Sequence, residues 1–194
     1  MTDASSIRKR LKRWEVDGQA RFITFSCQRR LPLFSDPRIA GVFVEALADA
    51  RVRHQYALYA WVVMPEHVHM LMRPAVGHSV EPALRSLKMA VSKRVIPRWV
   101  EHRAAILEQI VDGGGRPRFW QKGGGFDRNV RDTDEFCRTV RYIHRNPVER
   151  GLVERPDLWP WSSVRWWMGT REGEVECDPP PGQAGAWAAW KGFQ

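Results

Sequence analysis

Cysteine is scarce in this chain, and long apolar runs are missing. The three cysteines, Cys27, Cys137 and Cys177, are far apart and form no C-x-x-C pair. This pattern argues against a disulfide framework or a cysteine zinc ribbon and fits reduced thiols in the cytoplasm. No apolar run approaches the roughly 20 residues that a membrane span needs. The chain starts with polar residues and a basic cluster, so we expect no signal peptide and no membrane partner.

Acidic residues are also outnumbered. The 194 residues include 31 Lys and Arg against 22 Asp and Glu, which gives a net charge of +9. Such an excess favours a polyanionic partner, most often nucleic acid, although a basic surface without such a partner is the alternative. Arginine dominates the basic residues, and its planar guanidinium suits bidentate contacts with phosphate.

The length predicts one domain with appendages. Residues 1–19 are polar and contain the basic run Arg8–Arg13, which indicates either a basic N-terminal arm or a solvated stretch of charge. We expect the folded domain over residues 20–170. Residues 171–194 are rich in Gly, Pro and Ala and carry Trp187 and Trp190, so we expect a loosely ordered tail there.

Apolar patterning predicts alternating strands and helices. Runs of β-branched and aromatic residues are typical of strands and occur over 21–27, 56–64 and 67–73. Stretches with a start signal and an apolar stripe at helical spacing predict helices over 36–54, 79–97 and 132–145. Pro97 should bend or end the second helix, and Asn146-Pro147 should stop the third.

The order of these elements, with one more strand before the last helix, is strand, helix, strand, strand, helix, strand, helix. This order predicts an α+β fold in which helices pack on an antiparallel sheet, close to a ferredoxin-like βαββαβ pattern. Two Gly triplets, 113–115 and 123–125, lack the Lys-Ser/Thr pattern of a P-loop, so we interpret them as flexible turns.

Two histidines flank one apolar residue at the start of the third predicted strand. Strand alternation puts His67 and His69 on one face and turns Val68 toward a core. Two neutral imidazoles at this spacing can bind one divalent cation, whereas two solvent-facing or hydrogen-bonded histidines are the alternative. Two ligands are too few for a closed structural zinc site, so a metal here would occupy an open, chemically active site. A third ligand and a nucleophile should then lie elsewhere.

The last predicted helix carries Tyr142 about a quarter of a turn away from its core face. The phenol is either a half-buried packing residue or a group presented at the surface. Asn146 follows four residues later on the same side, where its amide oxygen suits Mg²⁺ or Mn²⁺ or, alternatively, caps the helix.

These motifs, taken in order, resemble the single-tyrosine HUH transposases, and more narrowly the REP-associated tyrosine transposases related to the insertion-sequence type. The resemblance covers roughly residues 18–168, and Glu66 departs from it because the family often has Asn there. It rests on His67-Val68-His69 after Met64-Pro65, on Phe119-Trp120-Gln121, on Tyr142–Val148 with Gly151-Leu152-Val153, and on Trp161-Ser162-Ser163.

The resemblance implies a fold of the HUH transposase type in which His67, His69 and Asn146 hold Mg²⁺ or Mn²⁺ and Tyr142 is the nucleophile. The implied activity is the cutting and rejoining of single-stranded or hairpin DNA through a 5′-phosphotyrosine intermediate. The protein would act as a monomer or homodimer associated with the nucleoid in the cytoplasm. A DNA-binding module that kept the fold without catalysis is the alternative.

Basic residues near these motifs are candidates for binding DNA phosphates, with ordinary surface charge as the alternative. They are Arg138, Arg141 and Arg145 on the helix of Tyr142, Arg165 in a tryptophan-rich segment, and Lys88 on the second predicted helix. Trp159, Trp161, Trp166 and Trp167 could stack on bases beside Arg165, although most tryptophans are expected to be packing residues. His144 points elsewhere on the helix than Tyr142 and is interpreted as structural or as a phosphate contact.

Overall fold

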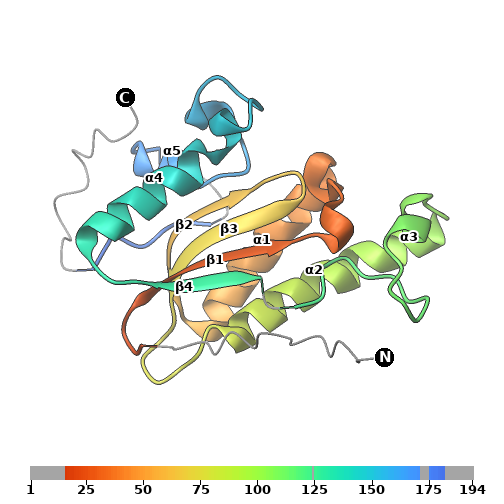
Figure 1. Ribbon diagram of the computed structural model, residues 1–194, viewed down its shortest axis with the longest axis horizontal. Coiled ribbons are helices and arrows are strands. Elements are labelled where there is room, and N and C mark those ends of the chain that lie inside the picture. The colour runs from red at the N-terminus through yellow and green to blue at the C-terminus, as the bar shows by residue number, and fades with distance from the viewer. Residues whose placement is uncertain (1–15, 124, 171–174, 182–194) are drawn as a thin grey trace, which may run out of the picture.

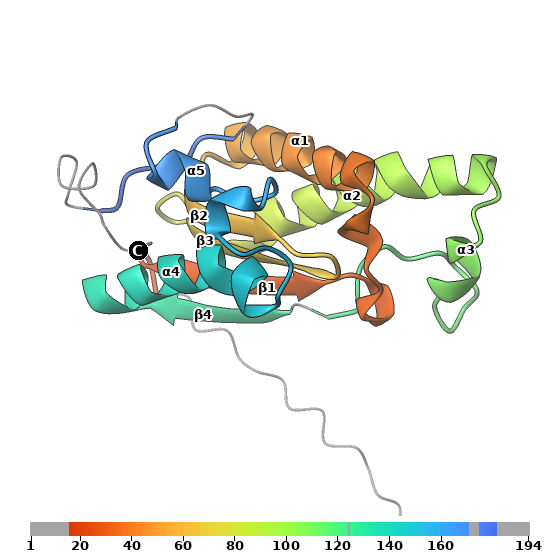
Figure 2. The same cartoon turned by 90° about the horizontal axis from the view of Figure 1, so that it is seen from above.

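The computed structural model describes residues 16–123, 125–170 and 175–181 of the chain. It confirms the α+β fold, because four antiparallel strands form one sheet in the order β2-β3-β1-β4 and helices cover both of its faces (Figures 1 and 2). The strands are β1 (Ala20–Ser26), β2 (Ala57–Val63), β3 (His67–Arg73) and β4 (Phe126–Val130). The helices are α1 (Pro37–His54), α2 (Glu81–Glu101), α3 (Ile106–Gln109), α4 (Thr133–Glu149) and α5 (Val164–Trp167), with 3-10 turns at Gln28–Arg30, Leu33–Ser35 and Pro156–Leu158.

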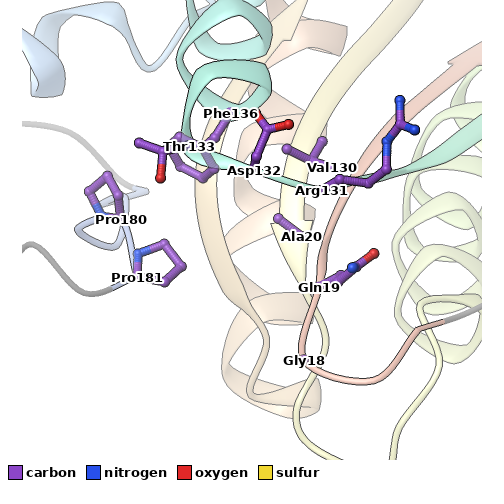
Figure 3. Close-up of a pocket in the computed structure, with 10 residues that line it drawn as sticks. All are labelled: Gly18, Gln19, Ala20, Val130, Arg131, Asp132, Thr133, Phe136, Pro180 and Pro181. Carbon is purple, nitrogen blue, oxygen red and sulfur yellow. The ribbon is translucent and has the colours of Figure 1, made fainter.

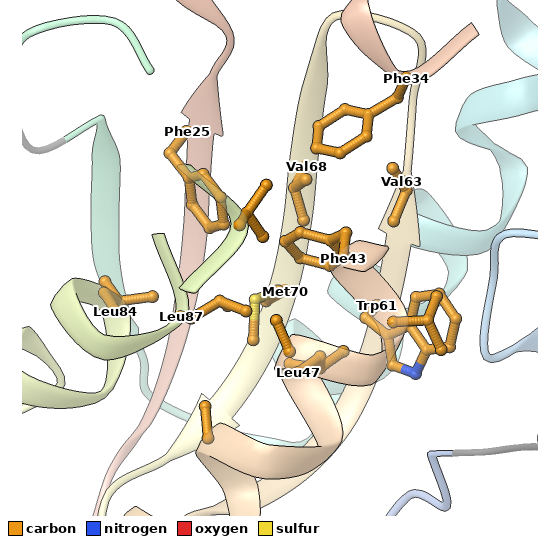
Figure 4. Close-up of a cluster of buried hydrophobic side chains, with 14 of the residues drawn as sticks. Phe25, Phe34, Phe43, Leu47, Trp61, Val63, Val68, Met70, Leu84 and Leu87 are labelled. Carbon is orange, nitrogen blue, oxygen red and sulfur yellow. The ribbon is translucent and has the colours of Figure 1, made fainter. Parts of the chain in front are cut away.

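The larger apolar core lies between the sheet and the helices α1 and α2. Phe43 and Leu47 of α1 and Leu87 of α2 meet Val68 and Met70 of β3 in this core (Figure 4). The strand residues are those that alternation turns away from the two histidines, as the sequence predicts. This core fixes the orientation of β3 and therefore the face on which the histidines emerge.

A smaller apolar cluster lies on the other face of the sheet, beneath α4. Phe136, Val140 and Ile143 of α4 pack there against Phe22 of β1 and Leu71 of β3. The helix α4 begins where Asp132 caps it by accepting a hydrogen bond from the backbone N–H of Glu135. The apolar stripe of α4 therefore holds its remaining, more polar side over the strands that carry the histidines.

The prediction that Asn146-Pro147 stops the last helix is wrong, because α4 continues through Pro147 to Glu149. Of the two effects predicted for Pro97, it does not end α2, which continues to Glu101. In α4 the proline is buried, so packing against the sheet offsets the hydrogen bond that a proline cannot donate. Just past the C-cap Arg150, Gly151 adopts φ +66°, and the N–H of Leu152 donates to the carbonyl of Pro147, which closes the end of the helix.

The edge of the sheet at β2 is covered by residues 159–167. Ser163 donates its backbone N–H to the carbonyl of Trp61, and Val63 donates its backbone N–H to the carbonyl of Trp161. The indole N–H groups of Trp159 and Trp167 donate to the carbonyls of Val63 and Tyr59. These two tryptophans therefore anchor the segment to β2, as expected for packing residues.

The expectation of a loose tail is wrong for its described part, residues 175–181. Val175 and Cys177 are buried in the larger core. The Asp178 carboxylate accepts hydrogen bonds from the backbone N–H of Leu58 and from Arg51, both at 2.7–2.8 Å. The folded body thus extends past residue 170, whereas Trp187, Trp190 and the basic run Arg8–Arg13 lie outside the described residues. No helix in the described ranges is long and apolar enough to span a membrane.

Candidate active site

His67 and His69 lie on the same face of β3, as alternation predicts, and both are buried. Their rings are 4.5 Å apart between centroids, and their Nε2 atoms are 2.9 Å apart. The two Nε2 atoms therefore point at one common position on the face of the sheet that α4 covers.

Each imidazole is oriented by a hydrogen bond at its other ring nitrogen. The Nδ1 atom of His67 lies 3.0 Å from Oε1 of Glu66, and the Nδ1 atom of His69 lies 2.6 Å from the hydroxyl of Thr24 on β1. A carboxylate can only accept, so His67 carries its proton on Nδ1 and keeps a lone pair on Nε2. The two Nε2 atoms lie within hydrogen-bond distance, so Nε2 of His69 can donate its proton to the lone pair of His67 while Nδ1 of His69 accepts from the Thr24 hydroxyl.

Both imidazoles are neutral at pH 7. Burial lowers the pKa of His67, although the nearby Glu66 carboxylate opposes this shift. Burial lowers the pKa of His69 to about 3, and the neighbouring His67 adds to the shift. A divalent cation between the two Nε2 atoms would require His69 to carry its proton on Nδ1, where the Thr24 hydroxyl can accept it.

Tyr142 stands on α4 directly beside the histidine pair. Its ring contacts the ring of His69 edge-on, with 5.3 Å between centroids, and the ring of Phe22 at 5.8 Å. The side chain is 41% exposed, although it borders the buried cluster beneath α4. The phenol is thus both held by aromatic contacts and open to a molecule that approaches from solvent.

Asn146 lies one helical turn beyond Tyr142, and the continuation of α4 through Pro147 places it inside the helix. In the sequence it lies midway between Tyr142, whose ring contacts His69, and Arg150, whose guanidinium contacts Glu66. Its buried Oδ1 accepts no hydrogen bond within the part of the chain that the structure describes. A buried amide oxygen without a partner costs free energy unless a donor or a cation satisfies it.

Glu66 joins the histidine strand to the tyrosine helix. Its Oε1 atom accepts hydrogen bonds from Nδ1 of His67 and, at 2.8 Å, from the guanidinium of Arg150 at the end of α4. Burial raises the pKa of Glu66, but the hydrogen bond from Arg150 and the adjacent His67 outweigh this and lower it overall. The charged carboxylate thus fixes both the ring of His67 and the distance between β3 and the end of α4.

The predicted phosphate-binding residues fall into two groups. Arg138, Arg141 and Arg145 are exposed on α4 beside Tyr142, and Arg165 is exposed on α5, where its Nε donates to the carbonyl of Asp157. Lys88 belongs to α2 on the opposite face of the sheet, where its ammonium lies over the rings of Phe25 and Trp120. The three helix arginines therefore share the helix of Tyr142, whereas Lys88 lies on the other side of the sheet.

Sequence reasoning missed the supporting residues. Thr24 contacts His69 only because β1 pairs with β3 in a register that puts them opposite each other. The partnership of Glu66 with Arg150 joins residues 84 positions apart. His144, in contrast, is structural: it is fully buried and its Nε2 lies 2.8 Å from the hydroxyl of Ser163. Burial lowers the pKa of His144 to about 3, so it stays neutral at pH 7.

A separate pocket opens where β4 leads into α4 (Figure 3). Ala20 and Val130, which pair across β1 and β4, form its floor, and Pro180 and Pro181 approach from the other side. Thr24 lies farther along β1, so the pocket is distinct from the histidine pair, and none of the candidate site residues lines it.

Two adjacent imidazoles beneath a helix with an exposed tyrosine form the arrangement that the resemblance to the tyrosine transposases implies. Residues 17–146 match the family described as "Transposase IS200 like", and the chain belongs to this family. It is 25% identical over 152 residues to the REP-associated tyrosine transposase of Escherichia coli strain K12, covering 78% of this chain and 80% of that protein.

One solved structure has a similar fold. It is described as the structure of the REP-associated tyrosine transposase bound to a REP hairpin, and it matches with a TM-score of 0.63 at 22% identity. The match covers 79% of this chain and 81% of that one. The predicted family and fold are thus confirmed.

Proposed function

We propose that this transposase cleaves and rejoins single-stranded DNA next to hairpins, with Tyr142 as the nucleophile and a divalent cation at His67, His69 and Asn146. The observation that carries the proposal is the ring of Tyr142 packed against His69, whose Nε2 converges with that of His67. The relative of known structure is described as bound to a REP hairpin, which supports hairpin DNA as the substrate class.

The donor set fits Mg²⁺ or Mn²⁺. Two donors at right angles on an octahedral ion, each about 2.0–2.1 Å from it, are about 2.9 Å apart, and the two Nε2 atoms have this separation. Among the described residues no group of three or more His, Cys, Asp or Glu could hold a metal, so a third protein ligand would be of another residue type. The unpartnered oxygen of Asn146 is such a donor, and the places left open suit a phosphate oxygen.

The chain supplies the nucleophile and positions the phosphate. The Tyr142 oxygen attacks phosphorus, the bond between phosphorus and the 3′ oxygen breaks, and that oxygen takes up a proton while the phenol loses one. The products are a 5′-phosphotyrosine and a free 3′-OH, so a later attack by a 3′-OH can rejoin strands without an external energy source. When bound, the cation would neutralise charge on the scissile phosphate and orient it for in-line attack. Arg138 and Arg145, exposed beside Tyr142, would hold flanking phosphates.

Replacement of a histidine tests the cation site. We expect His67→Ala to weaken Mn²⁺ binding by more than about 100-fold, because removal of a metal ligand should cost more than removal of a residue that only hydrogen-bonds to a ligand. Isothermal titration of the full chain with Mn²⁺ measures this, and a denaturing gel of labelled hairpin DNA from the repeats flanking the gene should show no adduct. His102→Ala removes an exposed imidazole at the end of α2 and should change neither result. Unchanged Mn²⁺ affinity in His67→Ala would refute the site.

Replacement of Glu66 tests the orientation of His67. We expect Glu66→Gln to weaken Mn²⁺ binding about 10-fold or more, because the charged acceptor that fixes the His67 tautomer is lost. Arg150→Met, which leaves the contact between Glu66 and His67 in place, should weaken Mn²⁺ binding less. Equal losses in both variants would mean that the ion pair, rather than the orientation of the imidazole, holds the site together.

A further inference from the structure

Exposed aromatic side chains gather at one place on the molecule. Among the aromatic residues that the structure describes, two are more than about a third exposed, Phe126 at 55% and Tyr142 at 41%. Both rings contact Phe22 edge-on, with 6.0 Å between the centroids of Phe22 and Phe126. The single exposed phenylalanine of the described ranges therefore lies beside the proposed nucleophile.

The register of the sheet fixes the distance from Phe126 to the histidines. Phe126 pairs with Thr24, and Thr24 pairs with His69 on its other side, so the three residues form one row across β4, β1 and β3. Neighbouring strands are about 4.8 Å apart, which puts Phe126 roughly 10 Å from His69 along this row. A nucleotide adjacent to a phosphate held at His69 would reach the ring.

Phe126 is also held firmly in place. It follows Gly125, whose φ of +70° lets β4 approach the backbone of Thr24 so closely that a Cβ there would lie 2.0 Å from the Thr24 carbonyl oxygen. The next residue, Asp127, is tied by an ion pair to the buried Arg21. An exposed ring on such an anchored strand is pre-organised for a partner and loses little conformational freedom on binding.

We propose that Phe126 is a stacking site for an unpaired base of the DNA strand, next to the phosphate that Tyr142 attacks. The proposal rests on the proposed function and adds the recognition of one nucleotide beside the cut. Aromatic faces beside cationic side chains are how proteins hold single-stranded nucleic acid, and here Arg128, two residues along β4, lies over the ring of Phe22 that Phe126 contacts. A base supplies the flat apolar partner, and its phosphates supply the matching charge.

The test is the affinity of the full chain for a fluorescein-labelled dT12 oligonucleotide, measured by anisotropy in EDTA so that no cleavage occurs. We expect Phe126→Ala to raise the dissociation constant about 5-fold or more and Phe126→Trp to restore wild-type affinity. The slope of affinity against salt should stay unchanged, because stacking releases no counterions. Val100→Ala, an exposed apolar residue of α2 on the opposite face of the sheet, serves as the matched control.

Several results would overturn the proposal. They are an affinity of Phe126→Ala within twofold of wild type, failure of Phe126→Trp to restore binding, or a loss explained by a changed salt slope. A shift in oligomeric state on light scattering, with unchanged DNA affinity, would assign Phe126 to contact with a second copy instead. Because the measurement needs neither cation nor cleavage, it can fail while the adduct assay succeeds, and the reverse also holds.

Discussion

Tyr142→Phe is expected to remove the covalent protein–DNA adduct and to reduce strand cleavage by more than about 10³-fold, because the variant lacks the oxygen that attacks phosphorus. The ring contacts with His69 and Phe22 persist in the variant, so the fold should be unchanged. The affinity for DNA should stay within about twofold of wild type. A denaturing gel with 5′- and 3′-labelled hairpin DNA, with Mg²⁺ or Mn²⁺ and with EDTA, measures both products.

Tyr56→Phe is the matched control for this experiment. Tyr56 is a buried phenol of the larger core whose hydroxyl donates to the carbonyl of Leu47, so its loss should cost about 1 kcal/mol of stability and leave the adduct unchanged. Cleavage that persists in Tyr142→Phe without an adduct would identify water as the nucleophile. Tight binding by the wild-type chain without any cleavage of the flanking repeats would favour a DNA-binding module.

The second large effect is expected from Gly125→Ala, which should lower the free energy of unfolding by about 2–4 kcal/mol. The new Cβ would lie 2.0 Å from the carbonyl oxygen of Thr24, so β4 must move away from β1 or the carbonyl of Thr24 must shift. Because the hydroxyl of Thr24 orients His69, the substitution should also weaken Mn²⁺ binding. Urea unfolding gives the stability, and titration with Mn²⁺ gives the affinity.

Gly115→Ala separates the clash from the cost of the backbone conformation. Gly115 has φ +75°, close to the +70° of Gly125, but no atom lies within 4 Å of its Cβ position. Its substitution should therefore cost only about 1–2 kcal/mol, the penalty of a left-handed conformation, and leave Mn²⁺ binding unchanged. Equal destabilisation by both substitutions would show that the approach of β4 to Thr24 does not matter.

The fold was largely predictable because its signals are local. The capping residue Asp36 with Pro37 gives the start of α1, and period-two alternation gives β3 with both histidines on one face. The spacing of Tyr142 and Asn146 on one side of a helix is likewise a matter of 3.6 residues per turn. These features depend on neighbouring residues only, so the sequence was sufficient for them.

Whether a proline ends a helix and what role a glycine has were not predictable in this way. Pro147 remains inside α4 because the helix is buried against the sheet, and the cost of the missing hydrogen bond is offset by packing. Gly125, interpreted as part of a flexible turn, instead permits close contact between two strands that are a hundred residues apart in sequence. In both cases the deciding interaction comes from a distant part of the chain.

The sequence by itself thus determined the fold class, the paired imidazoles and the helix that carries Tyr142. Tertiary structure alone decided that α4 lies over β3, which brings Tyr142 to His69 and Arg150 to Glu66, and that Lys88 lies on the opposite face of the sheet. It also placed Phe126 in one row with His69. The physical reason is that side-chain periodicity fixes which face a residue occupies within its own element, whereas strand order, register and core packing fix which faces meet.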